Sequence, residues 1–196
     1  MGLTLRAMSA AAQDDLCALV GPNCSDHLSF ANDGTVTVTA TDDELASNEA
    51  LSLISDLAGS ALLYGAFVGT EIPLEGQTII LGSGKGEFVG FNASTTPDDR
   101  PGVSYRPVVG FDGVAGVFAG AASAANFTAT DDRPIHRPSI LFHELAENYL
   151  RTEAKQQYRE AHPGANERER RLRAQRPELN NFAFGGGPFR REVPLR

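Results

Sequence analysis

The segment that most constrains the fold is an amphipathic stretch at residues 139–149, in the last third of the chain. Its apolar residues recur at helical spacing, and Pro138 suits the first turn of a helix. In a helix, His143 and Glu147 lie one turn apart on the same face. Because the residues around this pair are apolar, the sequence predicts a helix that carries two polar side chains close to the core, where charges need partners.

The order His143-Glu144-x-x-Glu147 is nearly the H-E-x-x-H motif of zinc hydrolases, with a carboxylate in the place of the second histidine. Imidazole nitrogen and carboxylate oxygen are both good ligands for Zn²⁺. Glu144 points about 100° away from His143 around the helix axis, where it can act as general base toward an attacking water. We therefore predict His143 and Glu147 as metal ligands and Glu144 as the catalytic residue.

A catalytic zinc needs three protein ligands, so a third must come from elsewhere, and His162 and Glu167 are both candidates. We prefer His162, because the His-Pro-Gly sequence that begins there can fold the chain back. Periodicity predicts one helix over residues 138–161, which would place His162 roughly 28 Å along the axis from His143. The prediction of His162 as a ligand therefore conflicts with the prediction of one long helix, and it requires the helix to end earlier, near Thr152.

These residues resemble the zinc-metallopeptidase-type toxin domains at the C-termini of bacterial polymorphic toxins and secreted effectors. Residues 141–147 match their apolar motif helix, and residues 51–64 resemble the helix that precedes the site. The resemblance extends over about residues 29–175, but only the pair His143 and Glu144 is specific. Glu147 departs from the family pattern, which has histidine there.

The resemblance implies a zinc-dependent hydrolase, most often a metalloprotease, with a zincin-like helix near residues 138–152. It also implies a protein substrate, a cognate immunity or chaperone protein, and a secreted effector delivered to another cell. Residues 1–12 lack the sustained apolar stretch of a signal peptide. The export signal would then lie elsewhere, and otherwise we expect a cytoplasmic protein.

Two other functions remain open at this point. The first is a non-enzymatic protein-binding module, in which Glu144 and Glu147 pair with arginines such as Arg151, four residues after Glu147. The second is a metal-dependent nuclease that uses the arginine-rich C-terminal third.

The charge and hydropathy of the chain indicate whether nucleic acids or membranes are expected partners. Residues 1–133 carry a net charge of −12 and residues 134–196 a net charge of +4. The acidic part argues against general nucleic-acid binding. The arginines between Arg168 and Arg176 alternate with glutamates, which predicts a solvated, salt-bridged helix face. Because no run of 18 apolar residues occurs, we expect no membrane span.

Several single residues have alternative roles. Cys17 and Cys24 flank a predicted turn, so either a disulfide or two buried thiols fits their spacing. A Cys-His dyad with His27 is less favoured than a structural role. We expect His136 to be an exposed loop residue rather than to line the cleft, and Tyr158 to pack rather than to bind an oxyanion.

The patterns together predict an α+β fold, with a β-rich N-terminal half packed on helices. The predicted organisation is a disordered lead-in at 1–12, a single metallohydrolase domain at 13–180, and an irregular Gly/Arg-rich tail at 181–196. The expected helices cover residues 13–20, 41–60 with a break near 47–48, 138–161 and 165–175. The expected β-structure covers residues 28–41, 62–68, 78–81, 87–91, 108–111 and 114–127, with an exposed loop at 93–107 and a glycine turn at 82–86.

Overall fold

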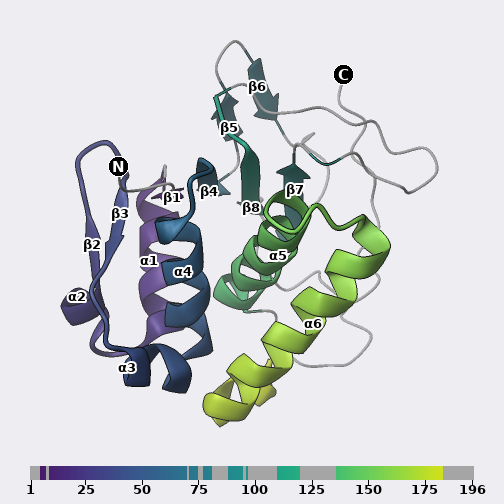
Figure 1. Cartoon of the computed structure of the whole chain (residues 1–196). Coiled ribbons are helices and arrows are strands. Elements are labelled where there is room, and N and C mark those ends of the chain that lie inside the picture. The colour runs from purple at the N-terminus through teal and green to yellow at the C-terminus, as the bar shows by residue number, and fades with distance from the viewer. Residues whose placement is uncertain are drawn as a thin grey trace.

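The structure is a computed structural model that describes residues 5–7, 9–69, 71–74, 77–80, 88–94, 96, 110–119 and 136–182 of the 196-residue chain. Its elements confirm the predicted α+β fold (Figure 1). The helices are α1 (Ala10–Val20), α2 (Cys24–His27), α3 (Asp42–Ser47), α4 (Glu49–Gly59), α5 (Arg137–Thr152), α6 (Tyr158–Gln175) and the 3-10 helix η2 (Pro177–Asn181). The strands are β1 (Leu5–Ala7), β2 (Leu28–Phe30), β3 (Val36–Val38), β4 (Tyr64–Gly69), β5 (Glu71–Leu74), β6 (Gln77–Ile80), β7 (Phe88–Ser94) and β8 (Gly113–Ala119).

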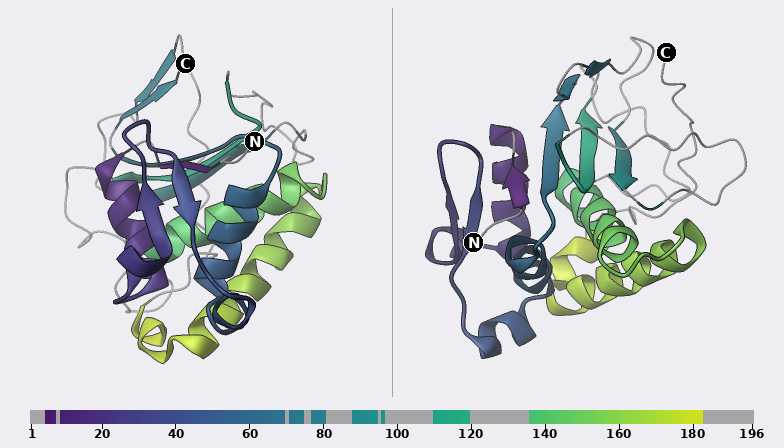
Figure 2. Two further views of the ribbon diagram at one scale, coloured as in Figure 1. Left: turned by 60° about the vertical axis from the view of Figure 1, so that its left-hand side comes forward. Right: turned by 45° about the horizontal axis from the view of Figure 1, so that its top comes forward.

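The central sheet has the strand order β1-β4-β8-β7, in which the first three strands are parallel and β7 runs antiparallel to β8. The pairing of β1 with β4 and the start of α1 at Ala10 correct the prediction of a disordered lead-in for those residues. In Figure 2, left, the sheet is seen nearly edge-on, with α1, α4 and α5 beneath it. The core therefore forms between one face of the sheet and these helices.

Helix α5 lies against β7 and β8 and contacts α6 on its other side. Its apolar residues Leu141, Phe142 and Leu145 are at most 1% exposed and join the main core. The backbone of β8 comes so close to α5 that a Cβ on Gly113 would lie 2.1 Å from Asn148 Oδ1. This close approach brings the polar face of α5 within reach of side chains on β7, the strand that pairs with β8.

The local signals in residues 28–60 gave correct predictions. The β-structure expected at 28–41 is present: β2 and β3 form an antiparallel hairpin, with Gly34 at φ 81° in its turn. Thr41 and Glu44 form a capping box at the start of α3. Asn48 then separates α3 from α4, because its side chain accepts a hydrogen bond from the Leu51 amide and so caps a new helix.

Cys17 and Cys24 form a disulfide with a Cα–Cα distance of 5.1 Å, which decides between the two alternatives left open by the sequence. The bond links the end of α1 to the start of α2. It also removes both thiols from the Cys-His dyad considered for His27, whose Nδ1 instead lies 3.2 Å from the Thr39 carbonyl oxygen.

Other β predictions were partly wrong. Of the strand expected at 108–111, residues 108–109 lie outside the described residues and residues 110–111 are not in a strand, since Gly110 is in a turn and β8 begins at Gly113. The expected exposed loop at 93–107 begins with Ala93 and Ser94 in β7, and Ser94 and Thr96 are buried. Strand β5 was not predicted. The glycine turn at 82–86, residues 97–107 and the tail beyond Phe182 lie outside the described residues. Within the part described, no helix has the length and apolar content needed to cross a bilayer.

Two predictions conflicted in the last third of the chain: one long helix over residues 138–161, and a helix that ends near Thr152 so that His162 can be a ligand. Helix α5 ends at Thr152, as the ligand prediction required and not at residue 161. Helix α6 begins at Tyr158 and continues through Pro163 to Gln175. The expectation that the His-Pro-Gly sequence ends a helix was therefore wrong, and His162 lies within the first turns of α6.

Candidate metal centre

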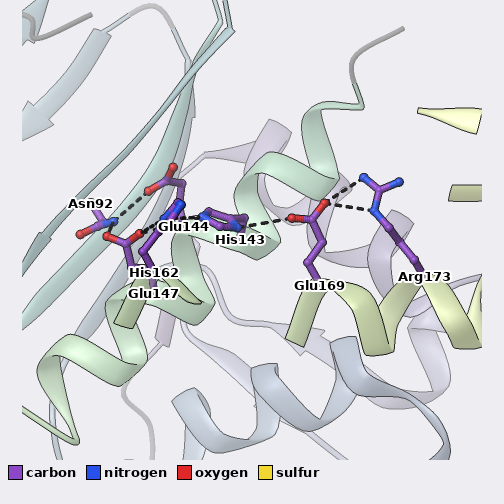
Figure 3. Close-up of polar contacts among 7 residues, drawn as sticks. All are labelled: Asn92, His143, Glu144, Glu147, His162, Glu169 and Arg173. Atoms are coloured by element: carbon purple, nitrogen blue, oxygen red, sulfur yellow. Dashed lines mark hydrogen bonds and ion pairs between the residues drawn. The ribbon is translucent and has the colours of Figure 1, made fainter. Parts of the chain in front are cut away.

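The candidate site lies between α5 and α6, where each helix presents one polar face to the other (Figure 3). Three polar residues on α5 follow one another at intervals of four positions, and three on α6 at intervals of seven and then four. Each set of three therefore falls on a single helix face. The α5 set is His143, Glu147 and Arg151, and the α6 set is His162, Glu169 and Arg173. Five of these six residues are at most 3% exposed, so the two faces form a buried polar seam.

His143, Glu147 and His162 form a cluster with metal-ligand geometry. His162 Nδ1 lies 2.8 Å from Glu147 Oε2 and 3.3 Å from His143 Nε2, and the latter two atoms are 3.9 Å apart. Donor atoms at tetrahedral positions about 2.1 Å from a zinc ion are about 3.4 Å apart. The observed distances lie on either side of this value, so the three donors fit one ion after small side-chain shifts.

The members of the cluster differ in exposure. His143 and Glu147 are each 2% exposed, whereas the side chain of His162 is 26% exposed. The ring of Tyr158 stacks on that of His162, with centroids 5.1 Å apart. Tyr158 therefore packs against a candidate ligand, and His162 is the member of the cluster that is partly accessible to solvent.

Glu169 is the functional candidate that the sequence interpretation missed. Its Oε2 lies 3.3 Å from His143 Nδ1, and its Oε1 accepts hydrogen bonds from the Arg173 guanidinium (Figure 3). The seven-residue spacing from His162 was the available signal, since it places Glu169 on the same helix face. The alternative ligand Glu167 lies on another face, where its half-exposed side chain pairs with Arg170.

Glu144 is held by Asn92 of strand β7, another residue that sequence interpretation missed. The Asn92 amide donates to Glu144 Oε2 at 2.9 Å and to Glu147 Oε1 at 2.8 Å. Gly90, two residues earlier on the same strand, leaves room for Glu144, because a Cβ there would lie 2.3 Å from Glu144 Oε1. Asn92 thus bridges the predicted base and a predicted ligand.

Arg151 fixes the orientation of this bridge. Its guanidinium donates to Asn92 Oδ1 at 2.7 Å and to the Thr96 carbonyl at 3.1 Å. With Oδ1 accepting from Arg151, the amide nitrogen of Asn92 must face the two carboxylates. The binding-module hypothesis predicted that the glutamates pair with Arg151, and the hydrogen bonds described here connect them through Asn92.

The two neighbouring carboxyl groups have opposite pKa shifts. Burial, followed by the nearby charge of Glu147, raises the pKa of Glu144 to about 7. Burial also acts on Glu147, but hydrogen bonds from His162 and Asn92 outweigh it and hold the pKa of Glu147 below its usual value. Near neutral pH, Glu147 is therefore an ionised ligand candidate, and Glu144 can both accept and release a proton.

Most of the arginines on α6 form ion pairs within the protein. Arg168 and Arg171 both contact Glu49 of α4, at 2.6 and 2.9 Å. The predicted salt-bridged face is thus confirmed, but it is not uniformly solvated, since Arg173 is only 3% exposed. This pairing leaves little of that face for the phosphate contacts that the nuclease hypothesis requires.

His136 was expected in an exposed loop, and the structure corrects this. It occupies the N-cap position of α5, its Nδ1 lies 2.8 Å from Ser139 Oγ, and its ring stacks on that of Phe182 with centroids 4.6 Å apart. Burial, with the nearby charges of Arg176 and Arg173, lowers the pKa of His136 to about 4. The folded protein therefore holds this histidine neutral.

The shifted pKa of His136 predicts a loss of stability in mild acid. Its pKa is about 6.5 in an unfolded chain, so the unfolded state binds more protons between pH 6.5 and 4 and stability falls as the pH is lowered through that window. Allowing for partial exposure, we expect this group to cost about 1–2 kcal/mol between pH 7 and pH 5. Urea unfolding of wild type and His136→Gln at both pH values measures it, and equal losses in the two proteins would contradict the prediction.

The likeness to toxin domains inferred from the motif is carried by His143 and Glu144 alone. The arrangement of the other centre residues, including Asn92 and Glu169, comes from the structure. Comparison with protein-family models, curated proteins and solved structures found no match to this chain, so its function has to be inferred from the chemistry of the centre.

Proposed function

We propose that this protein is a zinc-dependent hydrolase whose ion is held by His143, Glu147 and His162. The observation that carries the proposal is that donor atoms from two helices converge to within 3.9 Å of one another, and that one of the three residues, His162, is partly exposed. Two histidines and one carboxylate are a common ligand set of catalytic zinc, and such sites keep one position accessible. The softness of the donors favours zinc over magnesium or calcium.

A bound zinc ion would supply Lewis acidity, which polarises a scissile carbonyl and makes water a stronger acid. Glu144 would accept the proton of the attacking water and pass it to the leaving group, the role that a carboxylate beside such a centre can perform. Asn92 would keep the carboxylate of Glu144 beside the centre through its 2.9 Å hydrogen bond.

The substrate and setting are part of the same proposal. The motif around His143 and Glu144 resembles that of toxin metallopeptidases, which favours a peptide bond as the substrate. It also favours a secreted effector that is countered by an immunity protein. The ion pairs that occupy Arg168 and Arg171 disfavour a nuclease.

The decisive experiment is the zinc content of the purified protein, measured by plasma mass spectrometry after reconstitution and desalting. We expect about one zinc per chain in the wild type and close to none in His143→Ala or His162→Ala, because three protein ligands are needed for tight binding. His162 is the partly exposed ligand, so its variant should keep the fold even if the His143 variant does not. His27→Ala, which alters the histidine at the end of α2, away from the centre, is the matched control.

A second candidate function is a non-enzymatic protein-binding module. It is favoured by the partners that the buried charges already have, since Asn92 bridges Glu144 and Glu147, and Arg173 pairs with Glu169. This function predicts no zinc in the wild type after reconstitution. That result would overturn the hydrolase proposal and leave the polar seam as a structural network.

A further inference from the structure

The imidazole of His143 has polar partners at both of its nitrogens. Nε2 faces the candidate metal position, 3.3 Å from His162 Nδ1 and 3.9 Å from Glu147 Oε2. Nδ1 faces the opposite way, 3.3 Å from Glu169 Oε2. Figure 3 shows the ring between these two groups of side chains.

We infer that Glu169 is the positioning residue of the centre, which selects the tautomer of His143 that can bind zinc. A neutral imidazole has one N–H donor and one lone pair, and an ionised carboxylate only accepts hydrogen bonds. The Glu169 carboxylate, 3.3 Å from Nδ1, favours the N–H on that nitrogen, which leaves the lone pair on Nε2, the nitrogen that faces the metal position. The assignment rests on the proposed zinc site and adds the group that prepares it.

Glu169 is suited to this role because it is buried and paired with a cation. It is 0% exposed, and its carboxylate lies 2.8 Å from the guanidinium of Arg173. Arg173 donates from Nε and Nη2 to Oε1, at 3.1 and 2.8 Å, while Oε2 is the oxygen directed at His143. The carboxylate is therefore held in one orientation.

Arg173 is fixed in turn by the chain that follows α6. Its Nη1 donates to the carbonyl oxygens of Leu179 in η2 and of Phe182. A continuous set of contacts thus runs from the end of α6 through Arg173 and Glu169 to His143. Carboxylates that orient a metal-binding histidine in this way also raise its basicity, and their loss typically weakens metal binding 10–100-fold.

Glu169 is not itself a fourth ligand in this arrangement. It contacts Nδ1, on the side of the imidazole ring away from Nε2, and Arg173 already neutralises its charge. The position left for water or substrate is therefore not taken by this carboxylate. A positioning role accounts for a buried carboxylate at this place better than coordination does.

The test compares zinc affinity in wild type, Glu169→Gln and Glu167→Gln by competition with a chromophoric chelator. Glutamine keeps the size of the side chain but lacks the charge, so we expect Glu169→Gln to bind zinc about 10–100-fold more weakly. Glu167→Gln is the matched control, because Glu167 is on the same helix but pairs with Arg170 at the surface. Its zinc dissociation constant should equal that of the wild type.

A second measurement does not depend on the folding of the variant. In the zinc-loaded wild type, ¹⁵N NMR of the His143 ring should show a proton on Nδ1, and a proton on Nε2 would overturn the assignment. An unchanged dissociation constant in a folded Glu169→Gln would also overturn it while leaving the zinc site intact. Absence of zinc from the wild type would instead overturn the proposed function, and this assignment with it.

Discussion

Replacing Glu144 by glutamine should abolish hydrolysis without releasing zinc. Glutamine has nearly the same size and can still accept the hydrogen bond from Asn92, but it cannot take a proton from water. Because general acid–base groups contribute about 10²–10⁴-fold to rate, we expect kcat to fall by that factor. Hydrolysis of fluorescently labelled casein, with zinc content determined on the same preparation, measures both effects.

The control for this variant is Glu160→Gln, which changes the charge of the protein equally at an exposed position of α6. It should keep both zinc and activity. Full activity in Glu144→Gln would show that the base has been assigned to the wrong residue. Loss of zinc together with activity would show that Glu144 supports the ligands rather than the proton transfer.

Replacing Arg173 by methionine should destabilise the protein by about 3–5 kcal/mol. The change leaves the fully buried Glu169 carboxylate without its guanidinium partner, and breaking a buried ion pair on one side typically costs that much. It also removes the donor to the carbonyl oxygens of Leu179 and Phe182. The free energy of unfolding, measured by urea titration with excess chelator present, separates this effect from that of zinc.

Arg170→Met is the matched control for Arg173→Met. Arg170 is on the same helix and also pairs with a glutamate, but both side chains of that pair are more than half exposed. Exposed pairs contribute less than about 1 kcal/mol, so the control should be nearly neutral. Similar losses in the two variants would mean that the polar seam adds nothing beyond ordinary surface pairing.

Features that depend on neighbours in sequence were predictable. The capping box at Thr41, the helix break at Asn48 and the hairpin turn at Gly34 each depend on residues within a few positions of one another. The same holds for His143 and Glu147, which share a helix face at any point along a regular helix. Requiring His162 as a ligand added one long-range constraint, and it predicted the end of α5 more accurately than periodicity did.

Features set by packing between distant segments were not predictable. Asn92 reaches Glu144 only because β7 lies beside α5, and no local sequence pattern predicts the contact between these two elements. Helix α6 continues through Pro163 although proline usually ends a helix. At this point α6 packs closely on α5, since a Cβ on Gly164 would lie 2.6 Å from Leu150 Cδ1.

Under the proposed function, the separation of the candidate ligands over two helices would link the packing of those helices to the zinc concentration. His143 and Glu147 are on α5 and His162 is on α6, so the complete site exists only while the two helices are docked. By mass action, an ion that binds only this docked form adds about 4 kcal/mol of stability when its free concentration is 1,000 times the dissociation constant. The surroundings would thereby determine how firmly α6 stays in place, so that the same chain is loosely assembled where zinc is scarce and firmly assembled where it is abundant.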